Sequence, residues 1–415
     1  MTFVIMVSAK SSTVVRQPIS PKRIRLFKIL LSVAGLLCGL LMAEGVLRLV
    51  EKIQLGDRAV EGALIKDPVL GPKLAPFSKG HDANGFRNDT VPAQVDIVAL
   101  GDSQTWGVNV NRSDAWPQQL AKLSGRAVYS MSFGGFGPVQ YKSLTPQALK
   151  LSPKGIIIGL YLGNDIYDAY HLAYQYDAHR NLRNNLAAAE LTEDTVSARA
   201  ESFWAQEKQF HANFGRSSFS GWSFWLRGHS ALGRTLNRTG LWPGSVDLDY
   251  EIYRRWAETY PDRGTVCETP GEETVFTTAY RLVGLDLDEP RIVEGLRITK
   301  ELLGQMQSEL TGKNVKLMVV LVPTKETVYA AARTQSTVSN PVYQKLVQNE
   351  ARVRSELLAT CGANHIQCVD SLPYLTSHLE RGERLYPTST ESHPNAHGYS
   401  VVASAVNENL VKLGW

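Results

Sequence analysis

The sequence has few cysteines, little net charge and no repeats, which argues against several classes of protein. Only four of its 415 residues are cysteine, and no two of them form a C-x-x-C pair, which argues against a structural zinc site. Charged residues make up 20% of the chain and the formal net charge is only +4, so we expect no nucleic-acid partner. We find no internal repeat and no low-complexity tract in the sequence. What remains is the composition of a globular protein, with 43% hydrophobic residues and the length of one large domain or two smaller ones.

Long apolar runs are also scarce, apart from one near the N-terminus. Residues 29–43 carry no charge, and the apolar pattern continues to Val50, which supplies the roughly 20 residues that cross a bilayer. Basic residues precede the run and should stay in the cytoplasm. We therefore predict a cytoplasmic tail over 1–28, a single-pass anchor of the inner (plasma) membrane over 29–50, and a periplasmic or other extracytoplasmic chain beyond it. A cleaved signal peptide is the alternative, although Leu41-Met42-Ala43 is a poor cleavage site.

Strand-like and helix-like patterns alternate in the rest of the chain. Short runs rich in Val and Ile predict five strands, at Val95–Leu100, Ala127–Ser130, Gly155–Leu162, Val315–Val322 and His365–Val369. Helices are predicted from an Asp114 cap to Gly125, over Pro290–Leu310, and from Pro341 to Gly362. Such alternation predicts an α/β three-layer sandwich, in which helices cover both faces of a five-stranded parallel sheet.

Residues 166–289 separate the third and fourth predicted strands by far more than a crossover requires. The segment holds five of the eight tryptophans: Trp204, Trp222, Trp225, Trp242 and Trp256. We expect helix over 185–212 and irregular structure elsewhere. Because the segment begins at the end of a sheet strand, we predict an inserted lid or substrate-binding subdomain; the alternative is that its aromatic residues only form its own core.

Ser103 follows the first predicted strand directly, in the sequence V-A-L-G-D-S. Open α/β sheets bind ligands at the carboxyl ends of their strands, which makes Ser103 a candidate nucleophile. A serine hydroxyl needs a base that accepts its proton. The C-terminal segment E-S-H-P-N-A-H-G offers His393, with the carboxylate of Glu391 two residues before it.

Four short blocks occur in order along the chain: Gly101-Asp102-Ser103, Ser130 to Gly135, Gly163-Asn164-Asp165, and the segment around His393. Together they resemble the SGNH hydrolases, the G-D-S-type serine esterases and acyltransferases. The resemblance covers residues 95–165 and 315–415 and implies a flavodoxin-like sheet. We therefore assign an SGNH hydrolase domain to residues 91–165 and 290–415, after a connecting segment over 51–90.

The resemblance implies roles for the residues of these blocks. Ser103 would be the nucleophile and His393 the general base. An oxyanion hole would consist of the backbone N–H groups of Ser103 and Gly135 and the side-chain amide of Asn164. Asp102 would support the turn through hydrogen bonds.

Two positions depart from the family pattern. The usual acidic residue stands three positions before the histidine, where this chain has Thr390. Glu391 is therefore one option for the third triad member, and a carbonyl or water is the other. In the second block Ser130 replaces the usual Asn, which we expect to be tolerated. No cofactor is expected, and no metal site either, because the H-x-x-x-H pattern of His393 and His397 lacks a third ligand.

Three further features leave alternatives open. The sequence N-G-F-R at residues 84–87 should pack against the core, with Arg87 as a substrate ligand the minority alternative. Lys325, in V-P-T-K-E, is expected to bind an anionic sugar or to be a solvated loop charge. Cys361 and Cys368 form a disulfide or are two free thiols.

The sequence as a whole indicates an exported, membrane-anchored serine esterase. Its substrate would be an acylated carbohydrate or lipid, with acetyl as the expected acyl group. An O-acetyltransferase of extracellular polysaccharide is the first alternative. A non-catalytic glycan-binding or assembly protein with the same fold is the second.

Overall fold

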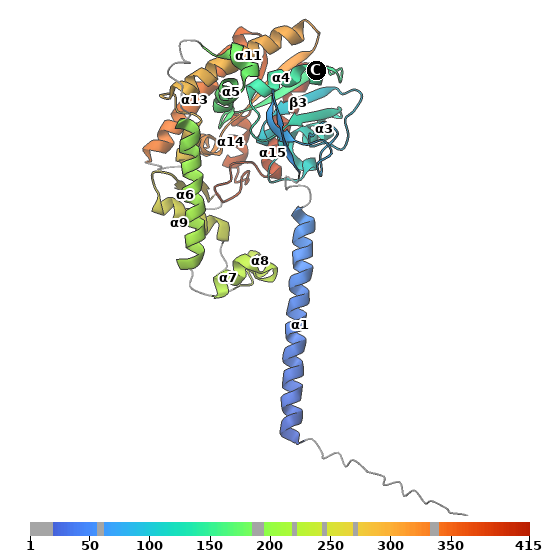
Figure 1. Cartoon of the computed structure of the whole chain (residues 1–415), viewed down its shortest axis with the longest axis vertical. Helices are drawn as coiled ribbons and strands as arrows, with labels where there is room; N and C mark the ends of the chain where they lie inside the picture. The colour runs from blue at the N-terminus through green and yellow to red at the C-terminus, as the bar shows by residue number, and fades with distance from the viewer. Residues whose placement is uncertain are drawn as a thin grey trace, which may run out of the picture.

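A central sheet of five parallel strands organises the chain in the computed structural model, which describes residues 20–55, 62–184, 195–217, 222–242, 247–268, 273–332 and 340–415 (Figure 1). The strands are β3 (Ile97–Gly101), β4 (Val128–Ser132), β5 (Gly155–Tyr161), β8 (Lys316–Val322) and β9 (Gln367–Asp370). Their spatial order is β4-β3-β5-β8-β9, which is the flavodoxin-like order. All five predicted strands and the predicted fold class are confirmed, with strand ends shifted by at most two residues.

Alternate residues of each strand face opposite layers of helices. On one face, Val98 and Leu100 of β3 pack with α4 (Pro138–Leu149), α11 (Pro290–Thr311) and α13 (Pro341–Ala363). On the other, Ile97 and Ala99 pack with α3 (Trp116–Ser124), α12 (Lys325–Ala331), α14 (Leu372–Glu380) and α15 (Ala396–Lys412). The sheet strands read as continuous apolar runs because both faces are buried.

The first predicted helix begins later than expected. Asp114 ends a 3₁₀ turn, η1 (Arg112–Asp114), and the N-cap of α3 is Ala115, which has no side-chain cap. The prediction of an Asp114 cap is therefore wrong. Pro117 lies in the first turn of α3, where a fixed φ and a missing N–H are tolerated, and this places the helix start at Trp116. The helix ends at Gly125, as predicted, with a left-handed φ of 68°.

The segment before the sheet packs against the core. It contains the antiparallel pair β1 (Leu64–Asp67) and β2 (Gly71–Leu74), followed by the N-G-F-R turn. Arg87 is 2% exposed and donates hydrogen bonds to the carbonyl oxygens of Gly107, at 2.8 Å, and Val110, at 2.9 Å. Its guanidinium also lies 3.9 Å from the centre of the Trp106 ring. The prediction that this segment packs against the core is confirmed, and the alternative prediction that Arg87 binds substrate is wrong.

Helix α1 (Pro21–Leu55) extends away from the globular body and is long and apolar enough to cross a membrane (Figure 1). It begins before the predicted span because the basic flank is itself helical, and Pro21 is tolerated in the first turn. Near its C-terminal end, the Glu44 carboxylate accepts hydrogen bonds from the backbone N–H groups of Ala231 and Leu232, both at 2.9 Å. Glu44 therefore caps α8 (Ala231–Arg238), a helix of the inserted segment.

The inserted segment is more ordered than predicted. Part of the expected helix over 185–212 lies outside the described residues, and α6 (Thr195–Ser217) covers the remainder. The prediction of irregular structure elsewhere is wrong. The further elements are α5 (Asp165–Gln175), η2 (Asp177–Leu182), α7 (Trp222–His229), α8, α9 (Leu248–Thr259), β6 (Thr265–Cys267), β7 (Thr274–Phe276) and α10 (Thr278–Val283). The N-cap Asp247 and i,i+4 ion pairs such as Arg255–Glu251 stabilise α9. These local helix signals are present in the sequence, but they are hard to recognise among the many aromatic residues.

Some aromatic residues of the inserted segment form a core of its own, and others line the pocket, so both predicted roles are found. Phe203 and Trp256 lie in a small buried cluster with Val275, separate from the two cores of the sheet. Trp204, Tyr253 and Tyr280 instead line the pocket at the carboxyl ends of the sheet strands. The segment therefore has a core of its own and also contributes a wall of this pocket.

The cysteines of the described residues are free thiols. Cys361 on α13 and the Cys368 thiol on β9 are hydrogen-bonded to each other.

Candidate active site

A sharp turn between strand and helix presents Ser103. This residue is the first of the short helix α2 (Ser103–Trp106), which follows β3 directly. The side chain of Asp102 caps α2 by accepting from the N–H of Gln104 at 2.9 Å. The turn requires glycine at position 101, because a Cβ there would lie 1.9 Å from the Thr105 hydroxyl oxygen. Ser103 thus stands at the carboxyl edge of the sheet.

The structure brings Ser103, His393 and Glu391 together in one hydrogen-bonded chain. His393 Nε2 lies 2.9 Å from Ser103 Oγ, and His393 Nδ1 contacts Glu391 Oε1. The same Glu391 oxygen accepts from the backbone N–H of His393 at 3.0 Å, which fixes the carboxylate against the ring. Ser103 Oγ also lies 3.2 Å from Asp102 Oδ2. A hydroxyl has only one proton to donate, and the shorter contact is the one to His393.

The surroundings of Glu391 keep its carboxylate ionised. Burial by itself would raise its pKa, but hydrogen bonds from His393 and Asn109 and the charge of His393 outweigh burial and hold the pKa well below its ordinary value.

Asp102, next to the serine in sequence, has a different environment, and burial raises its pKa to about 6. Asn109 was missed by sequence reasoning; its left-handed φ of 67° is a conformation in which Asn is enriched, but nothing in the local sequence signals it.

Lys325 anchors the loop that carries Glu391 and His393. It is 1% exposed, and its ammonium donates to the carbonyl oxygens of Pro387 at 3.0 Å, Ser389 at 2.8 Å and Glu391 at 3.1 Å. Both sequence interpretations of Lys325, a ligand for an anionic sugar and a solvated charge, are therefore wrong. Burial lowers its pKa to about 7, while three carbonyl acceptors match the three protons of the charged form.

The residues predicted for an oxyanion hole line the same pocket as the triad. The pocket has a volume of about 800 Å³, and Ser103, Gly135, Asn164, Glu391 and His393 are among its lining residues. Gly135 has a φ of 80°, which favours glycine there. A Cβ on the neighbouring Gly134 would lie 3.8 Å from the Ser103 Cβ, so this loop runs close to the serine. Asp102 is fully buried beneath Ser103 and is the one predicted site residue that is not among those lining the pocket.

Asn164 is positioned by the half-buried Asp168, which also lines the pocket. Its side-chain amide donates a hydrogen bond to Asp168 Oδ2, one turn further along α5. Burial raises the pKa of Asp168 to about 8. The hydrogen bond orients the amide nitrogen, which has a second proton available for a ligand in the pocket.

Arg281, from α10, completes the pocket on the side of the inserted segment. It donates a hydrogen bond to the Ser392 hydroxyl, and its guanidinium lies 5.1 Å from the centre of the Tyr280 ring. Burial alone would lower the pKa of Arg281, but Tyr161, Tyr280 and two carboxylates raise it above its ordinary value, so the side chain is a permanent cation. Sequence reasoning did not single out Arg281, because one arginine in a long insertion carries no local signal of its position.

Comparison with known proteins gives one family match and several solved structures of low similarity. Residues 286–413 match the family described as an SGNH hydrolase-like domain, acetyltransferase AlgX. A search of curated proteins finds no match. Similar solved structures include a phospholipase A1 from Streptomyces albidoflavus (11% identity, covering 76% of this chain and 100% of that one, TM-score 0.38) and a member of the lipolytic protein G-D-S-L family from Veillonella parvula (11%, 75% and 96%, TM-score 0.32). Another is a variant of an acetyl-xylooligosaccharide esterase from Geobacillus (10%, 78% and 96%, TM-score 0.34).

The family match covers the C-terminal part of the chain, including Glu391 and His393. The remaining blocks, around Ser103, Gly135 and Asn164, lie before it in sequence and line the same pocket. The strand order and the four motif blocks therefore agree with the fold of the SGNH/GDSL hydrolases, and residues 286–413 are similar to that family.

Proposed function

We propose that the protein is a serine esterase, which removes ester-linked acyl groups from a carbohydrate or lipid. The observation that carries this proposal is the hydrogen-bonded chain from Ser103 Oγ through His393 to Glu391. Acetyl is the acyl group that we expect. We assign the catalytic domain to residues 91–165 and 290–415 and a lid or substrate-binding role to residues 166–289.

The proposed reaction begins when Ser103 Oγ attacks the ester carbonyl and His393 Nε2 takes the hydroxyl proton. Glu391 holds the ring and stabilises the imidazolium that forms. Negative charge on the carbonyl oxygen is stabilised by the N–H groups of Ser103 and Gly135 and by the Asn164 amide. The imidazolium then protonates the leaving alcohol, and acyl-Ser103 remains. Water attacks this ester with His393 again as base, which releases the acid and restores the serine.

The lining of the pocket supports a carbohydrate or lipid as substrate. Trp204, Tyr253 and Tyr280 supply aromatic surface close to the serine. Aromatic faces suit both sugar rings and acyl chains. Residues of the inserted segment thus contact the substrate, while the catalytic groups come from the sheet domain.

An O-acetyltransferase is the second candidate, and the match to the acetyltransferase AlgX family favours it. The two activities share formation of acyl-Ser103. They differ in the acceptor, because a sugar hydroxyl would replace water in the second half of the reaction.

Helix α1 supports a location at the membrane. Its apolar span and the basic residues before it suit a single-pass anchor with the catalytic domain outside the cytoplasm. Esters of exported carbohydrates or of lipids would then lie within reach of the pocket.

Labelling with a fluorophosphonate probe tests the proposal. The full chain in detergent should label at Ser103, and Ser103→Ala, with an unchanged melting temperature, should not. Failure of the folded wild-type protein to label would contradict any serine-dependent activity. Release of acetate from p-nitrophenyl acetate, with no transfer to added oligosaccharide, is expected for the esterase. Efficient transfer would instead support the acetyltransferase.

A further inference from the structure

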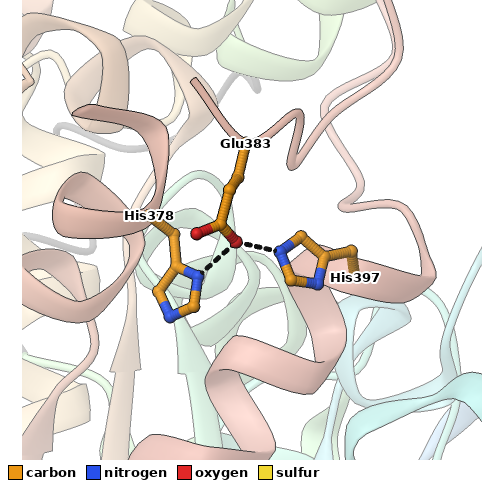
Figure 2. Close-up of side chains that lie close together, drawn as sticks. All are labelled: His378, Glu383 and His397. Carbon is orange, nitrogen blue, oxygen red and sulfur yellow. Dashed lines mark hydrogen bonds and ion pairs between the residues drawn. The ribbon is translucent and has the colours of Figure 1, made fainter. Parts of the chain in front are cut away.

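A second cluster of reactive side chains lies outside the pocket, where His378, Glu383 and His397 meet (Figure 2). His378 is in the last turn of α14, Glu383 is in the loop that follows, and His397 is in the first turn of α15. Their ligand atoms all lie within 4.8 Å of one another. The sequence pattern had paired His397 with His393, whereas the structure gives the two histidines different partners.

Both imidazoles aim at one atom. His378 Nδ1 lies 2.7 Å and His397 Nε2 lies 2.5 Å from the same oxygen, Glu383 Oε2. The dashed lines of Figure 2 show this convergence, with the carboxylate between the two rings. Arg381 Nε donates to the other oxygen, Glu383 Oε1, at 2.8 Å. The carboxylate is therefore fixed with Oε2 available as a single ligand atom.

We propose that His378, Glu383 and His397 bind a divalent metal ion, with Zn²⁺ as the best match to the donor set. Two imidazole nitrogens and one carboxylate oxygen are a ligand set that Zn²⁺ uses in proteins, with water in the fourth position. Zinc bonds of about 2.0–2.2 Å in tetrahedral geometry separate ligand atoms by about 3.3–3.5 Å. The contacts at Oε2 need to open by under about 1 Å, which side-chain rotation allows.

Proton accounting is simple at this site. A neutral imidazole has one N–H, and the two contacts to Glu383 Oε2 are those that such an N–H would make in the metal-free protein. On metal binding the ligating nitrogen must offer a lone pair, so the remaining ring proton stands on the other nitrogen. For His397 that other nitrogen, Nδ1, lies 3.4 Å from the Ser400 hydroxyl oxygen, an outer partner of the kind that orients metal-bound histidines.

The three side chains are accessible from solvent. His378 is 29%, Glu383 32% and His397 45% exposed, which leaves an entry path and room for a water ligand. The two rings lie 5.5 Å apart, centre to centre, at 69° to each other, so they do not stack and close the site.

The position of this site gives the ion a structural use. Glu383 and His397 flank the loop over 384–395, which carries Glu391 and His393. An ion bound to both residues and to α14 would restrain this loop at both ends. It would stabilise the geometry of the triad without touching the substrate.

Zn²⁺ titration of the full chain in detergent, by calorimetry after removal of metal, tests the site. We expect saturable binding of one Zn²⁺ per chain, weakened at least ~10-fold in His378→Ala, Glu383→Gln and His397→Ala. The matched control His365→Asn removes a histidine elsewhere and keeps a residue that tolerates its left-handed φ of 55°. It should bind like the wild type. No binding by the wild type, or equal binding by His397→Ala, would overturn the proposal.

Two further readouts separate the metal site from the activity. Co²⁺ in place of Zn²⁺ should give the visible absorption of a tetrahedral ion in the wild type, and His397→Ala should lose it. Amide hydrogen exchange over residues 384–395 should slow when Zn²⁺ is added to the wild type, but not in His397→Ala. Unchanged exchange would contradict the structural use. Fluorophosphonate labelling of Ser103 in the metal-free protein reports on the serine mechanism independently.

Discussion

The ammonium of Lys325 donates a hydrogen bond to the backbone carbonyl of Glu391, at 3.1 Å, and so contacts the loop that carries Glu391 and His393. Lys325 begins α12, directly after β8 of the sheet. The rigid centre of the fold is thereby connected to the loop that must place His393 against Ser103. Lys325 is thus a positioning residue, which acts through the loop without contacting substrate.

Replacement of Lys325 should therefore affect turnover more than substrate binding. Lys325→Met leaves three loop carbonyls without their donor and lets the His393 loop shift. We expect kcat to fall about 10- to 100-fold with a much smaller change in KM, because misplacement of a catalytic group acts mainly on the chemical step. Steady-state hydrolysis of p-nitrophenyl acetate measures both. Lys300→Met, which removes only the ion pair with Glu356, is the control and should behave like the wild type.

Glu391 should be the third member of the triad, in place of a backbone carbonyl or a water. Glu391→Gln removes the charge that stabilises the imidazolium and favours the wrong ring tautomer, so kcat/KM should fall by at least about 10²-fold. Thr390→Ala, at the usual family position, should change kcat/KM less than about 3-fold. A loss in Glu391→Gln no larger than that in Thr390→Ala would contradict this role of Glu391.

Asn164→Ala tests the proposed oxyanion hole. Loss of one donor to the developing negative charge should lower kcat by roughly 10²–10³-fold and leave KM nearly unchanged. Labelling of Ser103 by a small fluorophosphonate should also slow, since the attack places negative charge on the phosphoryl oxygen in the same position. Normal kcat in the folded variant would exclude Asn164 from the oxyanion hole.

Stability should depend on pH through Glu350, a fully buried residue of α13 that accepts from the N–H of Thr324 at 3.0 Å. Burial raises its pKa from the ordinary 4.5 to about 7. Between these values the folded protein holds a proton that the unfolded chain has lost, so this contribution to stability is present at low pH and is lost as pH rises through 7.

Urea unfolding of the wild type and Glu350→Gln at about pH 5 and about pH 8 measures the effect. The variant should lose less stability over that interval, by on the order of 1–3 kcal/mol. Glu356→Gln, on the exposed side of the same helix, should keep the wild-type dependence. Equal slopes for Glu350→Gln and the wild type would contradict the prediction.

The contact between α1 and α8 should depend on Glu44. Glu44→Ala removes the acceptor of two amides at the start of α8, which resembles the loss of a helix cap worth about 1 kcal/mol. Amide exchange at Ala231 and Leu232 should accelerate about 5-fold. Glu51→Ala breaks only the nearby ion pair with Arg234 and should leave these two amides unchanged.

Much of the fold could be predicted because its signals are local. Continuous Val and Ile runs predict buried parallel strands wherever they occur, and glycines such as Gly125 end helices through their own φ. The helix start at Trp116 and the helices of the insertion were harder to predict. There, Pro117 and the dense aromatic residues compete with the simple caps and periodicities that sequence reasoning uses.

The sequence pattern thus determined the strands of the sheet domain and the turn that presents Ser103. The family resemblance added the flavodoxin-like sheet and supported His393 as the partner of Ser103. Only the tertiary structure decided which carboxylate reaches His393, that Lys325 is buried beneath the loop, and that Arg281 enters the pocket. The physical reason is that periodicity and turn chemistry act over only a few residues, whereas the contacts of the site join residues far apart in sequence. The contact between Ser103 and His393 joins positions 290 residues apart, through a loop whose path depends on every helix packed beneath it.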